Sequence, residues 1–155
     1  MGGLKILHDN SLASRFADEI SECLKKHFGY KVNCAHSMPN DTITAHRAKM
    51  DLYFRFPNGY YRWNKQNDTL VIARIEFQEQ RAGHGTWLLA TLVRLASKYG
   101  YTQVGIECIS KSEGIQNFVR KFGFVPVSPT DNDPRDLVVS VAELKSRISH
   151  LGILS

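Results

Sequence analysis

A short segment with two glycines and an arginine has the composition of a phosphate-binding loop. Residues 80–85 read Gln-Arg-Ala-Gly-His-Gly, and a stretch with helical periodicity follows at once. Glycines at 83 and 85 allow positive φ and let the backbone approach a ligand without a Cβ in between. The first N–H groups of the helix would point outward unpaired, and their dipoles favour an anion. With Arg81 beside them, the loop is suited to a diphosphate.

A glycine pair alone is a weak signal, because ordinary turns also use glycine. A plain turn is therefore the alternative to a phosphate site. Other glycine-loop motifs fit less well: no third glycine follows at the dinucleotide-binding spacing, and no Gly-Lys-Ser/Thr of a P-loop is present.

The elements around this loop predict a strand, a helix and a second strand in succession. Residues 69–77 form an apolar, β-branched run, typical of a strand covered on both faces. Apolar residues recur at helical spacing over 86–99, and Gly100 ends that helix. Residues 103–109 should then pair parallel with the first strand, because the helix supplies the crossover. A second helix is expected over 112–121.

This order of elements resembles the GNAT superfamily of acyl-CoA-dependent N-acyltransferases, clearest over residues 69–127. The family's loop pattern is matched by Gln80, Gly83 and Gly85, and its K-x-G-F ending by residues 121–124. The resemblance implies an α/β fold: one GNAT-like domain over 1–155, with a mixed, twisted sheet flanked by helices. It also implies that the two central parallel strands splay apart and admit the pantetheine arm. An unbroken sheet, which would leave no slot, is the alternative.

The same resemblance implies an acetyl-CoA-dependent N-acetyltransferase that moves an acetyl group to a primary amine by direct transfer in a ternary complex. Backbone amides near the end of the central strand would bind pantetheine and the thioester carbonyl. His84 suits a phosphate contact better than base catalysis, with a solvent-facing side chain as its alternative. The residues expected to hold the coenzyme A moiety are Ile75, Phe77, Gln80, Arg81, Ala82, Gly83, His84, Gly85, Thr86 and Asn117.

Glu76 is the leading candidate for the general base. It stands near the C-terminal end of the central strand, where GNAT-like enzymes often place a carboxylate that acts directly or through water. Glu79 and Glu107 are weaker candidates. For each of the three, an exposed or salt-bridged carboxylate is the competing interpretation.

The general acid departs from the family pattern. Where the family commonly has a tyrosine that protonates the departing thiolate, this sequence has Val119, which cannot donate a proton. Three possibilities follow: Ser110, Ser112 or water supplies the proton, the thiolate leaves unassisted, or the chain binds acyl-CoA without turnover. Ser110 is named as a catalytic candidate because the family often has an asparagine in that neighbourhood. Cys108 could act as a nucleophile, although a buried strand cysteine is commoner.

Composition and net charge limit the classes of protein to which the chain can belong. Three cysteines without a C-x-x-C spacing predict reduced thiols rather than disulfides or a metal site. No apolar run approaches about 20 residues, so a cytoplasmic protein with no membrane span is expected. The net charge of +5 is compatible with an anionic cofactor, an acidic partner or nucleic acid.

The acceptor is not identified by the sequence: a small-molecule amine, a protein or an aminoacyl-tRNA would each be compatible, and a homodimer is possible. Two rival functions stay open. One is a non-catalytic acyl-CoA-binding or regulatory module. The other is a nucleic-acid-binding protein with the GNAT fold.

The rest of the chain supplies flanking elements. Apolar residues every four positions predict a helix over 12–28, which in the GNAT-like interpretation borders the acceptor site. Residues 30–48 read as a loop with one helical turn around 42–47. Further strands are expected at 4–7, 50–56, 60–63, 125–127 and 136–139. The strands at 50–56, 60–63 and 69–77 would form a meander, and a capping box at Ser140 would start a closing helix that ends at Gly152.

Overall fold

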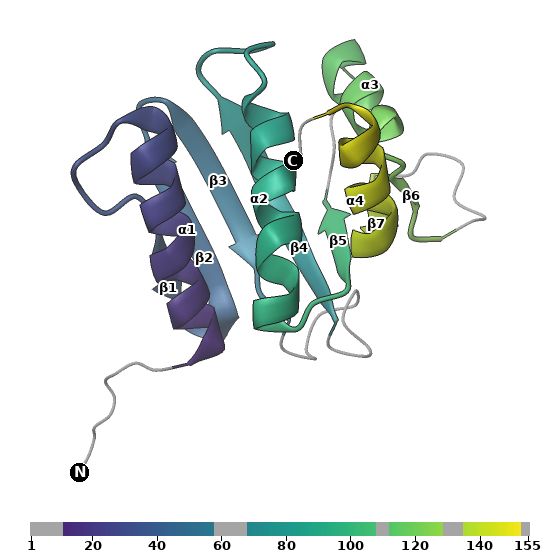
Figure 1. Cartoon of the computed structure of the whole chain (residues 1–155). Helices are drawn as coiled ribbons and strands as arrows, with labels where there is room; N and C mark the ends of the chain where they lie inside the picture. The colour runs from purple at the N-terminus through teal and green to yellow at the C-terminus, as the bar shows by residue number, and fades with distance from the viewer. Residues whose placement is uncertain (1–10, 58–67, 108–111, 129–134, 153–155) are drawn as a thin grey trace.

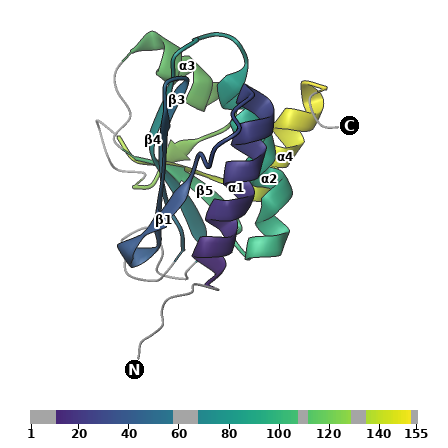
Figure 2. The ribbon, with the colours of Figure 1, turned by 90° about the vertical axis from the view of Figure 1, so that its left-hand side faces the viewer.

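The computed structural model describes residues 11–57, 68–107, 112–128 and 135–152. They form a seven-stranded mixed sheet in the order β1-β2-β3-β4-β5-β7-β6, with α1, α2 and α4 on one face and α3 on the other (Figures 1 and 2). None of the helices in these ranges has the length and apolar character needed to cross a membrane. In chain order, the elements are α1 (Leu12–Phe28), β1 (His36–Met38), a 3₁₀ turn (Pro39–Asp41), β2 (Thr42–Arg47), β3 (Met50–Arg55), β4 (Thr69–Phe77), α2 (His84–Tyr99), β5 (Gln103–Ile106), α3 (Glu113–Lys121), β6 (Val125–Pro126), β7 (Leu137–Ser140) and α4 (Val141–His150).

Helix α1 begins and ends where the sequence predicted, whereas α2 ends at the predicted Gly100 but begins at His84, two residues before the predicted start. At α1, the Ser11 side chain accepts a hydrogen bond from the N–H of Ser14, and Gly29 ends the helix at φ 80°. At α2, Gly100 ends the helix at φ 83° and donates its N–H to the carbonyl of Ala96. Left-handed φ favours glycine at both positions, which explains why these helices stop there.

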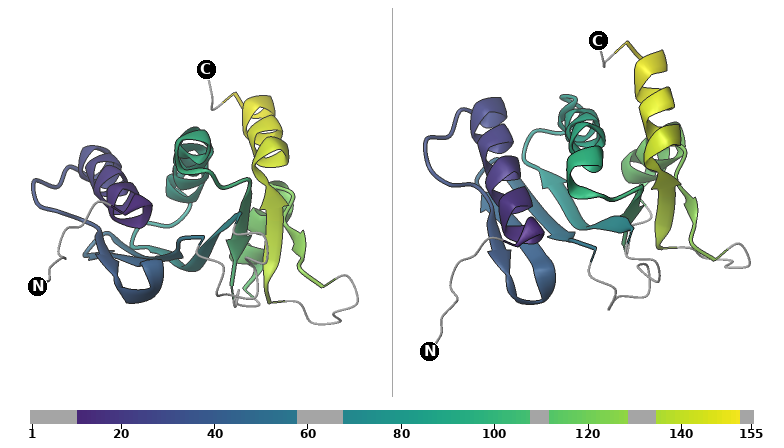
Figure 3. Two further views of the ribbon diagram at one scale, coloured as in Figure 1. Left: turned by 90° about the horizontal axis from the view of Figure 1, so that it is seen from below. Right: turned by 60° about the horizontal axis from the view of Figure 1, so that its bottom comes forward.

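The core lies between the sheet and the row formed by α1, α2 and α4 (Figure 3). The ring of Phe16 on α1 makes edge contacts with Phe54 on β3 and with Tyr99 at the end of α2. Leu88 and Leu92 of α2 are fully buried in the same layer. Burial of these side chains fixes α1 and α2 across the sheet, and so sets the relative position of their ends.

β4 and β5 are parallel neighbours, as predicted. β4 pairs with β5 over Thr69–Ile72, against Gln103–Ile106, and β4 itself continues to Phe77. On its other edge, Tyr53 lies opposite Arg74 and Phe54 opposite Ile72, so that Ala73 is an extra residue in β4. Such a bulge bends a strand and increases its twist. The described ladder between β4 and β5 reaches Ile72 and Ile106, and residues 108–111, which follow β5 in the chain, lie outside the described residues.

The expectation of a loop over residues 30–48 is wrong. This segment contains β1 and β2, which pair antiparallel across the turn at 39–41, and β2 pairs with β3 along its whole length. Asn40 and Asp41 have φ of 64° and 57° in that turn, so the Pro-Asn-Asp signal marks a hairpin. The strand was missed because its buried side chains include Thr42 and Ala45, which give a weak alternating pattern.

The expected meander also needs correction. Both edges of β3 are occupied, by β2 on one side and by β4 on the other. The antiparallel unit is therefore β2-β3-β4, and residues 60–63 are not the hairpin partner of β3 over Met50–Arg55. Residues 60–63 and the strand predicted at 4–7 lie outside the described residues.

The C-terminal elements agree with the sequence. Gly123 N–H bonds to the carbonyl of Arg120, and Phe124 N–H bonds to that of Val119, so the K-x-G-F ending is a Schellman cap of α3. β6 and β7 form the predicted antiparallel hairpin. The Ser140 side chain accepts from the N–H of Glu143 at 3.0 Å and starts α4.

Candidate functional site

The start of α2 presents backbone amides without a side-chain cap. Gly83 occupies the position before the helix at φ 84°, and having no side chain it makes no capping hydrogen bond. The first helical bond runs from the N–H of Trp87 to the carbonyl of Gly83, at 2.9 Å. The N–H groups of residues 84–86 therefore have no intrahelical acceptor. Residues 80–83 before them are exposed, so an anion can reach this end of the helix.

The expected role of Gly85 is wrong in one respect. Gly85 lies inside α2 and is not among the residues with positive φ. A Cβ at this position would be only 2.8 Å from Cε1 of Phe118 on α3. The absence of a side chain here lets α3 pack against the start of α2, a non-local contact that the loop pattern could not show.

Glu76 lies on the part of β4 that extends beyond β5. Its neighbour Phe77 packs against the ring of Phe28 on α1, so alternation along the strand directs Glu76 to the opposite face of the sheet. Glu76 is exposed and sits opposite Asp51 of β3. The Asp51 carboxylate lies 3.4 Å from Nη1 of Arg74, and no ion pair of Glu76 is found among the described residues. Glu76 therefore offers an accessible carboxylate near the C-terminal end of the central strand.

The other two carboxylates are engaged elsewhere. Oε1 of Glu107, a buried side chain, lies 3.2 Å from Nε of Arg55, as the salt-bridged interpretation predicted. Glu79 is exposed, and its Oε1 lies 3.4 Å from Nε2 of His84.

His84 does not face solvent, contrary to the alternative considered from the sequence. Its side chain is 16% exposed and packs against the rings of Phe28 and Phe77. Nδ1 of His84 lies 2.9 Å from Nε2 of His27, whose ring stacks on Trp87 at a centroid distance of 3.9 Å. Burial, followed by the nearby His84, lowers the pKa of His27 below its usual value.

No motif or spacing in the sequence marks His27 as a candidate site residue. It stands in the segment Lys25-Lys26-His27, which reads as a basic, solvated end of a helix. Its partner is 57 positions away, and only the packing of α1 beside α2 brings the two rings together.

The structure describes Val119 and Ser112, two of the positions considered for the general acid, and also Asn117. Val119 is 3% exposed and belongs to the hydrophobic core, so this position supplies no proton donor. Ser112 is the exposed residue that precedes α3. Asn117 is also exposed, and its Oδ1 accepts a hydrogen bond from Nη1 of Arg120 at 3.0 Å. Ser110 and Cys108 lie outside the described residues.

Replacing Val119 with tyrosine is not expected to restore an acid. The larger side chain must displace core atoms, which should lower the free energy of unfolding by about 1–3 kcal/mol. The variant Val125→Tyr is the control, because Val125 is 55% exposed on β6 and tolerates a larger side chain. Urea unfolding and the rate of coenzyme A release from acetyl-CoA would test both. A stable Val119→Tyr protein with a faster reaction would contradict the expectation.

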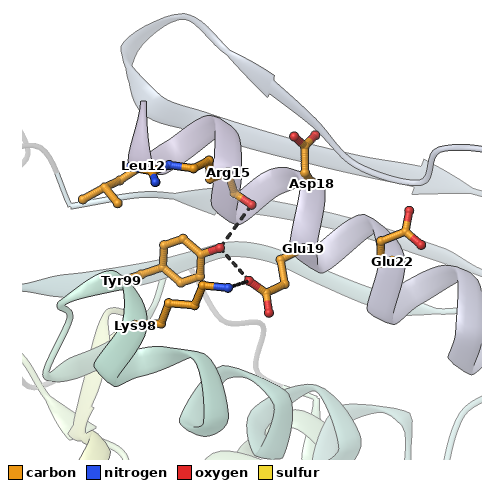
Figure 4. Close-up of a pocket in the computed structure, with 7 residues that line it drawn as sticks. All are labelled: Leu12, Arg15, Asp18, Glu19, Glu22, Lys98 and Tyr99. Carbon is orange, nitrogen blue, oxygen red and sulfur yellow. Dashed lines mark hydrogen bonds and ion pairs between the residues drawn. The ribbon is translucent and has the colours of Figure 1, made fainter. Parts of the chain in front are cut away.

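An open hollow of about 450 Å³ lies between the other ends of α1 and α2 (Figure 4). The Tyr99 hydroxyl donates to Oε1 of Glu19 at 2.6 Å, and Nζ of Lys98 lies 2.8 Å from the same oxygen. These hydrogen bonds lower the pKa of Glu19, and burial raises that of Tyr99. The side chains of Glu19, Lys98 and Tyr99 thus bond to one another and connect α1 with α2, which gives this hollow a structural explanation. No group of three potential metal ligands is found in the described ranges.

Comparisons with known proteins give matches at the level of structure only. No family model and no curated protein sequence matches the chain. FdhC, a nucleotide-linked sugar GNAT in its apo form, is similar with a TM-score of 0.51 and 9% identity, over 87% of this chain and 71% of FdhC. A GNAT acetyltransferase from Elizabethkingia anophelis with acetyl-CoA bound has a TM-score of 0.44 and 17% identity, over 82% and 87% of the two chains.

A GNAT-family acetyltransferase from Staphylococcus aureus Mu50 gives a TM-score of 0.45 and 13% identity, over 88% of this chain and 97% of that one. At sequence identities this low, structural similarity is evidence for the fold alone. The chain therefore has an α/β fold with a seven-stranded mixed sheet, similar to the fold of FdhC, a GNAT protein.

Proposed function

We propose that this protein is an N-acetyltransferase that moves an acetyl group from acetyl-CoA to a primary amine. The observation that carries the proposal is the start of α2, whose first amides have no side-chain cap and follow the central strand β4 through an exposed loop. An anion site at this helix start, together with a split between β4 and β5 beyond Ile72 and Ile106, would fit the diphosphate and pantetheine parts of one ligand.

The residues in the described part of the chain fit coenzyme A. The N–H groups of residues 84–86, together with Arg81, would hold the diphosphate. A Cβ placed on Gly83 would meet no atom within 4 Å, so the space in front of the helix is open. Backbone groups of Ile75 and Phe77 on the free part of β4 would hold pantetheine. Bound acetyl-CoA would supply the acetyl group as a thioester.

The protein's own groups would position the amine and remove its proton. Glu76, the exposed carboxylate near the C-terminal end of β4, would accept the proton of the amine either directly or through water. Holding both reactants in one complex removes much of the entropic barrier of a bimolecular step. The acceptor is proposed to be a primary amine, whether of a small molecule, a protein or an aminoacyl-tRNA.

Cofactor binding is the first test. We expect coenzyme A or acetyl-CoA to be found by mass spectrometry in the purified protein, and acetyl-CoA to bind in calorimetry. An acceptor screen that follows the free thiol of coenzyme A would then identify the amine. Absence of any acetyl-CoA binding would contradict the proposal.

A non-catalytic acyl-CoA-binding module is the second candidate, and one observation favours it. The position of the family's usual tyrosine is a buried valine, Val119, so no proton donor stands there. This candidate predicts tight cofactor binding and no release of coenzyme A with any amine. Turnover with one amine would exclude it.

A further inference from the structure

Two histidines from different helices form a hydrogen-bonded pair beside the start of α2. His27 is in the last turn of α1, and His84 is the first residue of α2. The two nitrogens lie 2.9 Å apart, and the other ring nitrogen of His84 lies 3.4 Å from Oε1 of Glu79. Trp87 covers one side of the His27 ring, with 7° between the ring planes. A carboxylate and two imidazoles are thus connected in a row.

The hydrogen bonds limit how many protons the pair can hold. A bond between two imidazole nitrogens requires one nitrogen with a hydrogen and one without. When Glu79 accepts from Nε2 of His84, the free nitrogen Nδ1 accepts from Nε2 of His27. A pair with both imidazoles charged would place two N–H groups against each other. The pair therefore holds at most one positive charge.

The surroundings determine when that charge is present. The C-terminal end of α1 favours a cation on His27. Burial, followed by the nearby His84, acts in the opposite direction and lowers the pKa of His27, which favours its neutral form in the free protein. Charged groups near these ends of the helices include Glu79 and Arg81 in the loop before α2, Lys25 and Lys26 in the last turn of α1, and Lys49, whose Nζ donates to the carbonyl of Phe28 at 3.1 Å. The charged residues elsewhere on α1, α2 and β4 are Arg15, Asp18, Glu19, Glu22, Arg74, Glu76, Arg94 and Lys98. From α3, the residue that contacts the start of α2 is the uncharged Phe118.

We propose that this histidine pair takes up a proton when the diphosphate of acetyl-CoA binds at the start of α2. The inference rests on the proposed function, because it concerns the same anion site. The backbone N–H of His84 belongs to that site, so a bound phosphate lies close to the imidazole pair. A negative charge at this distance favours the protonated form of histidine. The proton comes from the solvent and remains on the pair while the cofactor is bound.

Proton uptake on binding makes the affinity for acetyl-CoA depend on pH. The free protein holds fewer protons at pH 6.5 than the complex, so the affinity for acetyl-CoA should rise as the pH falls through this region. Near pH 8, well above the usual pKa of histidine, this contribution should vanish.

The test is calorimetric titration with acetyl-CoA at pH 6.5, in buffers with different ionisation enthalpies. The slope of the observed enthalpy against the buffer enthalpy gives the number of protons taken up. His27→Gln keeps a hydrogen-bonding group in place of Nε2 but does not titrate, and His27→Phe keeps an aromatic ring on Trp87. His150→Gln is the matched control, since His150 is an exposed histidine on α4.

We expect wild type and His150→Gln to take up more protons than both His27 variants, by up to about one proton per bound acetyl-CoA. The phosphomonoester of acetyl-CoA titrates in the same pH region and contributes to the measured proton uptake. This contribution is the same for all variants, so it cancels when their proton uptake is compared. Equal uptake by all four proteins would overturn this inference alone. An equal loss of affinity in the His27 variants at pH 6.5 and near pH 8 would also overturn it, because it would show a purely structural role. No binding by wild type would instead overturn the proposed function.

Discussion

Glu76→Gln is expected to lower the rate of acetyl transfer by about 100-fold to 10,000-fold, the usual contribution of a general base. Glutamine keeps the shape of the side chain but does not accept the proton of the amine. Because Glu76 is exposed and has no ion pair among the described residues, the fold should hardly be affected. The affinity for acetyl-CoA should also stay close to that of wild type. Steady-state rates together with calorimetric binding would measure both quantities.

Glu107→Gln is the control for this experiment, because it changes the same side chain in the same way at a different place. Glu107 is buried against Arg55, so its replacement should reduce stability. If Glu76→Gln loses rate and cofactor affinity equally, Glu76 has a structural role and another group is the base.

Gly83→Val is expected to weaken binding of acetyl-CoA by about 10-fold to 100-fold. Gly83 has φ of 84°, a conformation that a β-branched residue rarely adopts, so the backbone before α2 must shift. The amides of residues 84–86 would then point away from the diphosphate. Loss of one hydrogen bond to a charged group costs about 1.5–3 kcal/mol, which corresponds to this range of affinity. Calorimetry with acetyl-CoA would measure the change.

Gly100→Val provides a closely matched control at the other end of the same helix. Gly100 has φ of 83°, and a Cβ on either glycine would meet no atom within 4 Å. Both variants should therefore lose similar stability, about 1–3 kcal/mol of backbone strain. Only Gly83→Val should lose cofactor affinity. Equal affinities in the two variants would show that the start of α2 does not bind the diphosphate.

Local sequence signals predicted the elements that carry the proposed site. The apolar spacing of α1 and α2 and the glycines after them defined both helices, since periodicity and left-handed caps are encoded within a few residues. The hairpin of β1 and β2 was missed because β2 buries small residues such as Thr42 and Ala45. A strand of this kind is recognised by its pairing with β3 rather than by its own composition.

Contacts between distant residues could not be predicted in the same way. The pairing of His27 with His84 and the packing of Phe118 on Gly85 each depend on where two helices meet. The family pattern marked Gly85 correctly as a special position, but the constraint there comes from α3. Val119 stands where the family commonly has a tyrosine, and the structure shows it as a core residue without a proton to donate.

The additional residue at Ala73 changes which positions of β4 turn inward. Before it, even-numbered residues such as Leu70 and Ile72 belong to the core under the helices. After it, odd-numbered Phe77 takes the inward direction and packs on Phe28. Without that one-residue offset, an acidic side chain at 76 would share the inward side with leucine and isoleucine. A single insertion thus allows one strand to be hydrophobic scaffold at its beginning and to display a carboxylate to water at its end.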